Sequence, residues 1–329
     1  MKKIFVYFII SILTLSMLTI GCSSNSTTQT SKEETVRIGI IQLVEHPSLD
    51  YIRTGVLKAI KDNGYVEGKN LELDYQNAQG DQSTLNTIAN KFAGENLDVI
   101  IAITTPATQA AAAATSSVPI IFGAVTDPVA ANLVKSLENP GTNVSGVSDL
   151  NPFEAQFEMI QKIVPDAKKL GIIFNTSEVN SQVQVDKAKE IGGTLGYEII
   201  TAPINTSNEV LQAAQSLVGK IDAFYVITDN TVATSINSLS EIARENKIPA
   251  IVAEDSQVEG GCLCSIGIDY ETLGYQTGEM AVRVLKGANP SEMPVEYQTK
   301  LKVVINSETQ DILGITIPEE YTKNATYVK

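Results

Sequence analysis

The sequence has 329 residues, of which 43% are hydrophobic, 19% charged and 6% aromatic. A chain of this length and composition can bury a large core and has room for two domains, which excludes a disordered, collagen-like or multi-pass membrane protein. The 24 Lys and Arg residues against 38 Asp and Glu give a net charge of -14. This charge repels polyphosphates, so no nucleic-acid partner is expected.

The amino terminus has the organisation of a secretory signal peptide. Two lysines precede an apolar run over residues 4–18, and the small residue Gly21 comes directly before Cys22. The run is shorter than the about 20 residues that cross a bilayer, and the position of Cys22 favours cleavage over an uncleaved anchor helix. The segment resembles the lipobox of bacterial lipoproteins. This implies that residues 1–21 are a lipoprotein signal peptide and that Cys22 is lipidated.

Residues 22–35 are predicted to be a flexible tether, because this segment is rich in Ser, Thr, Asn and Gln and contains no large apolar side chain. The body that follows is acidic and would not bind an anionic lipid surface by itself. We therefore expect an extracytoplasmic protein that is anchored to the cell membrane through its lipid alone.

From residue 36 onward, short apolar runs alternate with amphipathic segments of helical length. This alternation predicts an α/β fold with repeated strand–helix units and a mostly parallel sheet. Because the runs are almost entirely apolar, both faces of the sheet should be covered. The predicted strands span residues 36–42, 99–103, 119–122, 170–174, 223–227 and 250–253.

An internal repeat divides the body into two halves. The matched segments are 37–41 with 169–173, 97–104 with 221–228, and 118–121 with 248–251. Generic strand composition could produce one such match, but three in the same order predict two similar, doubly wound parallel-sheet lobes. Ligands of open parallel sheets bind outside the carboxyl ends of the strands, so the predicted site is a cleft between the lobes.

The strand ends carry groups that suit a zwitterion. Thr104 and Thr105 begin a predicted helix, and the free backbone N–H groups at its start favour a carboxylate. At the matched position of the second half, the carboxylate of Asp229 can pair with an ammonium group. A free amino acid is therefore the favoured ligand. The alternative, that such residues only cap helices, applies to Thr105, Asp127, Asp229, Asp255 and Asp269.

The sequence shows no set of residues that could catalyse a reaction or bind a metal. His46 is the only histidine, so no multi-histidine metal site can form, and no nucleophile with a neighbouring base is found. Cys262 and Cys264 are predicted to lie on a strand, to point to one face and to be small buried residues. We expect no enzyme activity, no metal and no cofactor.

Eight short motifs together resemble those of ABC transporter substrate-binding proteins of the tryptophan/tyrosine type. The resemblance extends from about residue 36 to the carboxyl terminus. The motifs are QLVEHPSLD (42–50), NAQGD (77–81), TTPAT (104–108), VTDPV (125–129), NVSGVSD (143–149), SEVNS (177–181), TDNTV (228–232) and GIDYETLG (267–274).

The resemblance implies a type I periplasmic-binding-protein fold, with two lobes and a cleft between them. The chain would cross between the lobes near residues 146–152, 268–270 and 298–303. Lobe 1 would comprise residues 36–147 plus 270–297, and lobe 2 residues 148–269 plus 298–329. The implied function is that of an extracytoplasmic solute-binding lipoprotein of an ABC importer. It would be a monomer that captures an aromatic or other hydrophobic amino acid and delivers it to permease subunits driven by a separate ATPase.

The residues expected to contact the ligand lie at the strand ends of both halves. Thr104 and Thr105 are expected to take the carboxylate, and Asp229, together with Asp269, the amine. Two alternatives stay open: a membrane-tethered module that senses a ligand for a signalling partner, and an importer receptor for a peptide, purine or other solute. The predicted contacts are Gln42, Glu45, His46, Thr104, Thr105, Thr126, Asp127, Ser177, Asn180, Asp229, Asn230, Glu254, Asp269 and Tyr270, with Tyr270 or Phe174 as an apolar wall.

Overall fold

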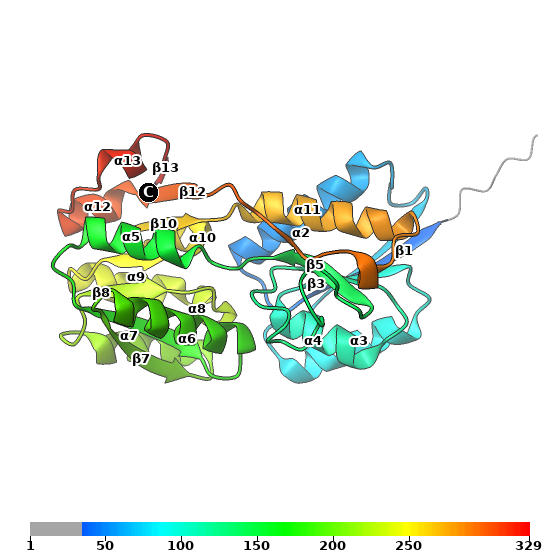
Figure 1. Ribbon diagram of the computed structural model, residues 1–329, viewed down its shortest axis with the longest axis horizontal. Coiled ribbons are helices and arrows are strands. Elements are labelled where there is room, and N and C mark those ends of the chain that lie inside the picture. Colours follow the sequence, from blue (N-terminus) through cyan, green and yellow to red (C-terminus); the bar gives the residue numbers. More distant parts are fainter. Residues whose placement is uncertain (1–34) are drawn as a thin grey trace, which may run out of the picture. The chain divides into compact units, whose positions relative to one another are not determined.

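The structure is a computed structural model that describes residues 35–329. The predicted signal peptide, the lipidation site Cys22 and residues 22–34 of the predicted tether lie outside the described residues. Residues 35–329 form one compact unit that contains two sheets (Figure 1). Within this described part of the chain, no helix is both long enough and apolar enough to cross a membrane.

The first sheet is parallel throughout and forms the centre of the first lobe. Its strands are β1 (Val36–Gln42), β2 (Leu71–Asn77), β3 (Val99–Ile103), β4 (Ile120–Gly123), β5 (Val144–Ser148) and β11 (Glu296–Tyr297). Its helices are α2 (Pro47–Asp62), α3 (Gln82–Gly94), α4 (Thr105–Ala114), α11 (Tyr270–Leu285) and the short η2 (Pro290–Glu292). The strand order is β11-β5-β4-β3-β1-β2. Side chains of α2 and α11 pack on one face, and those of α3 and α4 on the other.

The second sheet forms the centre of the second lobe. Its strands are β6 (Lys169–Asn175), β7 (Glu198–Ile204), β8 (Ala223–Val226), β9 (Ala250–Val252), β10 (Cys264–Gly267), β12 (Lys302–Asn306) and β13 (Thr326–Val328). Its helices are α5 (Phe153–Ile163), α6 (Val179–Thr194), η1 (Ser207–Glu209), α7 (Val210–Leu217), α8 (Asn230–Ala233), α9 (Ile236–Glu245), α10 (Asp255–Glu259), α12 (Ser307–Leu313) and α13 (Glu319–Thr322). The order is β13-β12-β10-β9-β8-β6-β7, and only β12 runs antiparallel to its neighbour β10 among the described pairs.

The sheet topology confirms the internal repeat. The three matched segments form β1 and β6, β3 and β8, and β4 and β9, which occupy the same places in the two strand orders. The pairing register of the matched strands is also the same in the two sheets. Ile38 pairs with Val99 in the first sheet, and their matched residues Leu170 and Ala223 pair in the second. The two lobes are therefore doubly wound α/β units, as the sequence predicts.

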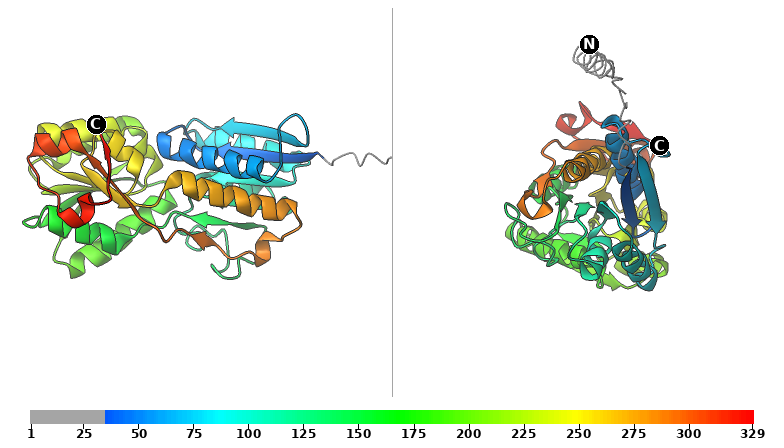
Figure 2. Two further views of the ribbon diagram at one scale, coloured as in Figure 1. Left: turned by 90° about the horizontal axis from the view of Figure 1, so that it is seen from above. Right: turned by 90° about the vertical axis from the view of Figure 1, so that its right-hand side faces the viewer.

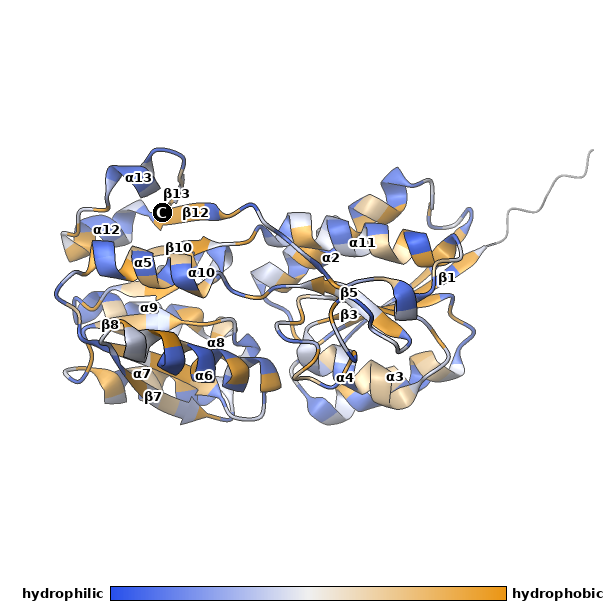
Figure 3. Ribbon diagram, in the orientation of Figure 1, coloured by the Kyte–Doolittle hydropathy of each residue, from blue (hydrophilic) through white to orange (hydrophobic). Residues whose placement is uncertain are grey.

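Glycines let α2 and α11 cross at close range. A Cβ atom on Gly55 would lie 2.1 Å from the carbonyl oxygen of Glu271, and one on Gly274 would lie 2.0 Å from that of Ile52. Only glycine permits this approach. The two helices lie side by side in Figure 2 although they are far apart in sequence. In Figure 3 both show hydrophobic and hydrophilic stretches along their length, as expected for helices with one buried face.

The chain passes between the two sheets three times. The passages lie between Ser148 and Phe153, between Gly267 and Tyr270, and between Tyr297 and Lys302. Each passage follows a strand of one sheet and precedes an element packed in the other lobe (Figure 1). A small number of short segments therefore connects the lobes.

The prediction that Cys262 and Cys264 point to one face is wrong. Cys264 packs in the core cluster that contains Tyr225, whereas Cys262 packs in the cluster that contains Phe224, on the other face of the sheet. The reason is that β10 begins at Cys264, so strand alternation does not extend back to Cys262. Both side chains are buried and free, and burial raises the pKa of the Cys262 thiol to about 12.

Candidate functional site

A cavity of about 20 Å³, which is room for about one water molecule, lies between the two lobes. Residues that follow strands of both sheets form its wall, as the strand-end rule predicts. They are His46, Leu49, Thr104, Thr105, Ala124, Thr126, Asp149, Asn180, Thr228, Asn230, Glu254 and Tyr270.

The structure brings together eight of the fourteen predicted contact residues at this cavity. These are His46, Thr104, Thr105, Thr126, Asn180, Asn230, Glu254 and Tyr270. Leu49, Ala124, Asp149 and Thr228 also line the cavity, although they were not predicted to contact the ligand. Ala124 and Thr228 follow predicted strands and Asp149 closes the motif NVSGVSD, so the sequence carries a signal for each of these three.

The residues by which the first lobe lines the cavity lie in a row, in the order of the strands that they follow. Asp149 follows β5, Thr126 follows β4, Thr105 follows β3 and His46 follows β1, and these four strands are consecutive in the sheet. Neighbouring strands lie about 4.8 Å apart. The carboxyl group of Asp149 and the imidazole of His46 therefore stand at opposite ends of this row.

The start of α4 offers a place for an anion. Thr104, and not Thr105, is the N-cap residue, with a φ of 95° and a long contact of 3.5 Å from the Ala107 N–H to its hydroxyl. The hydroxyl of Thr105 is buried and has no hydrogen-bond partner among the described residues. A buried, unpaired hydroxyl beside the positive end of a helix dipole favours a carboxylate as its partner.

Two buried carboxyl groups face the cavity. Asp149 accepts a hydrogen bond of 3.0 Å from the Thr126 hydroxyl, and Glu254 accepts one of 2.5 Å from the Ser48 hydroxyl. Burial raises the pKa of the Asp149 carboxyl to about 6 and that of the Glu254 carboxyl to about 8. A cation bound between them would favour their ionised forms and would reverse these shifts.

His46 and Asn180 add unpaired polar atoms to the same cavity. His46 is 5% exposed, and neither of its ring nitrogens has a hydrogen-bond partner among residues 35–329. Burial lowers the pKa of the imidazole to about 4, so the ring is neutral at pH 7. The side-chain oxygen of Asn180 is also unpaired within the described structure. Unpaired buried polar atoms are rare in proteins, and a ligand that enters the cavity would supply their partners.

Asp229, predicted to bind the ligand's amine, does not line the cavity. It is fully buried, and its Oδ2 atom accepts hydrogen bonds from the Asn175 N–H (2.6 Å) and the Ser181 hydroxyl (2.7 Å). Its Oδ1 atom accepts from the Val232 N–H at 2.8 Å, which caps α8. These bonds join β6, α6 and α8, so the geometry gives Asp229 a structural role.

Other predicted contacts are also engaged elsewhere. Asp269 caps α11 by accepting from the Thr272 N–H at 2.7 Å, and Asp127 accepts from the Ala130 N–H at 2.9 Å. The side chain of Gln42 donates to the Val44 carbonyl at 2.9 Å. The remaining predicted residues that lie outside the cavity wall are Glu45, which is exposed, Ser177, which lines a larger groove that shares Asn230 with the cavity, and Phe174, which packs in the core of the second lobe.

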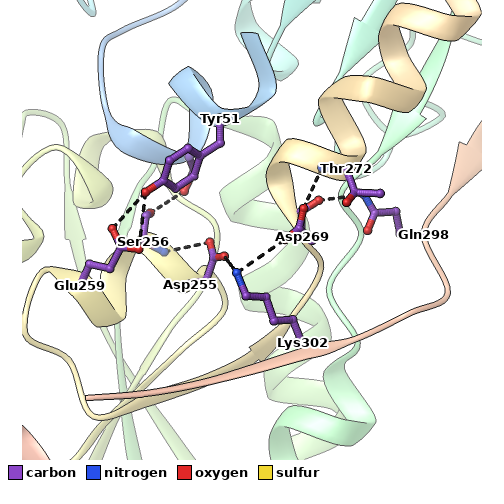
Figure 4. A network of polar contacts seen from close by, with 9 residues as sticks. Tyr51, Asp255, Ser256, Glu259, Asp269, Thr272, Gln298 and Lys302 are labelled. Atoms are coloured by element: carbon purple, nitrogen blue, oxygen red, sulfur yellow. Dashed lines mark hydrogen bonds and ion pairs between the residues drawn. The ribbon is translucent and has the colours of Figure 1, made fainter. Parts of the chain in front are cut away.

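Polar contacts join the lobes beside the cavity (Figure 4). The Tyr51 hydroxyl of α2 donates to Glu259 of α10 at 3.1 Å. At the passages between the lobes, the Lys302 ammonium lies 3.0 Å from Asp255 and 3.5 Å from Asp269 (Figure 4). These contacts hold α2 against α10 and tie two of the passages together.

The sequence comparisons agree with this geometry. The family model of ABC transporter substrate binding proteins matches residues 37–329. A tyrosine-binding protein from Clostridioides difficile is 46% identical over 335 residues, which cover 100% of this chain and 96% of that protein. The similarity therefore includes both lobes.

Two solved structures resemble this chain to different degrees. An ABC domain from Streptococcus pneumoniae in complex with L-Trp has a TM-score of 0.87 at 38% identity, with 90% of this chain and 100% of that one covered. A substrate-binding protein with adhesive properties from Clostridium difficile, in its ligand-free, open structure, has a TM-score of 0.71 at 50% identity, with 90% and 99% covered. The fold is that of the type I periplasmic binding proteins. In structure this chain is closer to the L-Trp complex, although its sequence is closer to the open protein.

Proposed function

This chain belongs to the ABC transporter substrate binding protein family, and we propose that it captures a free aromatic amino acid in the cavity between its lobes. It is a solute-binding protein and not an enzyme. The observation that carries the proposal is the composition of the cavity wall. A helix start with an unpaired hydroxyl and two buried carboxyl groups line one small space.

The two charged groups of an amino acid match these two features. The ligand's carboxylate lies at the start of α4, where the Thr105 hydroxyl donates to it. Its ammonium group lies between Asp149 and Glu254, one from each lobe. Because the ammonium stabilises the ionised carboxylates, each group compensates the other for the water lost on binding. In this proposal Glu254 takes the role that was predicted for Asp229.

The ligand's side chain needs the less polar part of the wall. Leu49, Ala124 and the ring of Tyr270 supply apolar surface in the cavity. The names of the relatives support an aromatic ligand, since one is a tyrosine-binding protein and another structure holds L-Trp. A ligand enclosed by both lobes would bind as they close.

We place the protein outside the cytoplasm as the receptor of an ABC importer, working as a monomer with permease subunits. The charged start, apolar run and Cys22 of the sequence support a lipoprotein held by its lipid. The segments 36–147 with 270–297 and 148–269 with 298–329 are proposed to move as two bodies about the three passages.

Thermal unfolding of the lipid-free chain, residues 23–329, tests the proposal, since this chain keeps the whole compact unit. Bound ligand is first removed under denaturing conditions, and the refolded protein is tested with each amino acid. A ligand at 100 times its Kd adds about 2.7 kcal/mol to the free energy of unfolding. We expect tyrosine, tryptophan or phenylalanine to raise the Tm and acidic and basic amino acids to leave it unchanged. No response to any amino acid would reject the proposal.

A further inference from the structure

His46 is a buried imidazole whose ring nitrogens make no hydrogen bond of normal geometry within the described chain, although the side chain of Asn230 lies near enough to act on its pKa. It is the N-cap residue of α2, and its carbonyl oxygen accepts from the N–H groups of Leu49 (3.1 Å) and Asp50 (3.2 Å), so its backbone is fixed. Its side chain lines the cavity and is 5% exposed, and neither ring nitrogen is hydrogen-bonded within the described chain. A neutral imidazole has one donor and one acceptor, and burying both without partners is unfavourable. Asn230 can satisfy at most one of the two ring nitrogens, and a ligand in the cavity can supply the partner of the other.

The position of His46 indicates which part of an amino acid it meets. Along the row of strand ends, Thr105 and Thr126 lie between His46 and Asp149. The strands that His46 and Asp149 follow are three strand spacings apart, or about 14 Å. A ligand whose carboxylate and ammonium occupy the Thr105 to Asp149 part of this row therefore extends its side chain toward β1, where His46 lies.

The surroundings of His46 suit a ring with one polar atom. Leu49, in the first turn of the same helix, lines the cavity beside it with an apolar side chain. Asn230 lines the cavity from the second lobe. This combination can hold the face of an aromatic ring and one hydrogen-bonding group on it, because the neutral imidazole can either accept a hydrogen bond from that group or donate one to it.

We propose that His46 is a specificity-determining residue, which hydrogen-bonds a polar atom on the ligand's aromatic ring. The site then prefers tyrosine, with its phenol hydroxyl, or tryptophan, with its indole N–H, to phenylalanine. This inference rests on the proposed function and adds a rule for selecting among aromatic ligands. Phenylalanine fills the same space but leaves the imidazole without this hydrogen bond. A site that hydrogen-bonds a hydroxyl group of its ligand rejects the analogue that lacks the hydroxyl.

Calorimetric titration of the ligand-stripped protein with L-tyrosine, L-tryptophan and L-phenylalanine measures the preference. Whichever of L-tyrosine and L-tryptophan is the better ligand should bind at least about tenfold more tightly than L-phenylalanine. In His46→Leu, which replaces the imidazole by an apolar side chain of similar bulk, this ratio should fall toward one through loss of tyrosine or tryptophan affinity. Leu49→Ala is the matched control, and it should weaken all three ligands by a similar factor.

A spectroscopic test uses the unmodified protein. Because His46 is the only histidine, 15N-histidine labelling gives the signals of one imidazole. Tyrosine or tryptophan should shift one ring nitrogen in the way that a hydrogen bond does, and phenylalanine should not. Equal affinities for all three ligands, or identical nitrogen shifts, would overturn the role of His46 and leave the amino-acid function intact. Binding of no amino acid at all would reject the proposed function itself. The nitrogen shifts decide the matter even if His46→Leu does not fold.

Discussion

The hydroxyl of Ser48 on α2 lies 2.5 Å from the Oε2 atom of Glu254, which lines the cavity from the other lobe. The same hydroxyl lies 2.5 Å from that of Ser256 on α10. A carboxyl group proposed to bind the ligand's ammonium is thereby also a contact between the lobes. This relationship gives a direct route by which ligand binding stabilises the arrangement of α2 against α10.

Replacing Glu254 by Gln should weaken amino-acid binding by at least about tenfold, because the ammonium loses one of its two charged partners. Calorimetric titration of the stripped variant measures the Kd. Glu308→Gln is the matched control, since Glu308 lies on α12, away from the cavity, and is exposed. An unchanged Kd in Glu254→Gln would exclude this carboxylate from the ammonium site.

Asp229→Ala tests the structural role that the hydrogen bonds assign to Asp229. Loss of the α8 cap and of two further bonds to buried partners should lower the free energy of unfolding by about 1–3 kcal/mol. Urea denaturation measures this loss. The Kd for the ligand should change less than in Glu254→Gln. The opposite pattern, with full stability and a larger loss of affinity, would restore Asp229 as the ligand contact.

Proton release on binding follows from the buried carboxyl groups. Burial raises the pKa of Glu254 from the ordinary 4.5 to about 8 and that of Asp149 to about 6. An ammonium group favours the ionised forms, so binding near pH 7 should release protons and affinity should rise between about pH 6 and pH 8. Titration calorimetry in buffers of different ionisation enthalpy counts the protons. A binding enthalpy that is the same in all buffers would contradict the ammonium site.

In the ligand-free protein, the raised pKa of Glu254 makes the stability fall with increasing pH, whereas the affinity for the ligand rises. Because the folded pKa of Glu254 lies above the unfolded value, its contribution to stability is complete below about pH 4.5 and is lost as the pH rises through about 8. Added ligand should therefore raise the Tm more at pH 8 than at pH 6. Thermal unfolding at the two pH values, with and without ligand, checks this difference.

Tyr51→Phe should speed the release of ligand. The variant removes the hydroxyl that donates to Glu259 at 3.1 Å across the lobes, which is an exposed bond of modest strength. We expect the dissociation rate to rise a few-fold and the association rate to stay the same. The chain contains no tryptophan, so the fluorescence of bound L-tryptophan reports the rates in stopped flow. Tyr327→Phe on β13, which is 51% exposed, is the control. Equal dissociation rates in the two variants would show that the Tyr51 hydroxyl does not slow the release of ligand.

Strands with a continuous apolar run could be predicted from the sequence, whereas edge strands could not, and neither could the buried strand β5, which reads VSGVS. The run that forms β3 is apolar throughout and entirely buried, and the prediction matches it residue for residue. β2 lies at the sheet edge and reads LELDYQN, with only Leu71 buried. β7 is likewise an edge strand of mixed polarity. A half-exposed edge strand has no continuous apolar run, so the pattern that identified the others is missing there.

The site could be predicted to the level of strand ends but not of single side chains. The motif TDN at 228–230 was identified, yet Thr228 and Asn230 line the cavity while Asp229 between them points into the protein. Which members of such a motif face the ligand depends on the local backbone direction, which the sequence pattern does not contain. Asp149 was missed for a related reason, because only the position of β5 in the sheet brings it to the row of strand ends.

A crystal structure of the stripped and refolded protein with L-tyrosine would show where the two charged groups of the ligand bind. We expect the ligand's ammonium nitrogen within hydrogen-bond distance of both Asp149 and Glu254. We expect its carboxylate at the start of α4, against the Thr105 hydroxyl. A ligand in the reverse orientation, or one bound outside the cavity between the lobes, would contradict this binding mode.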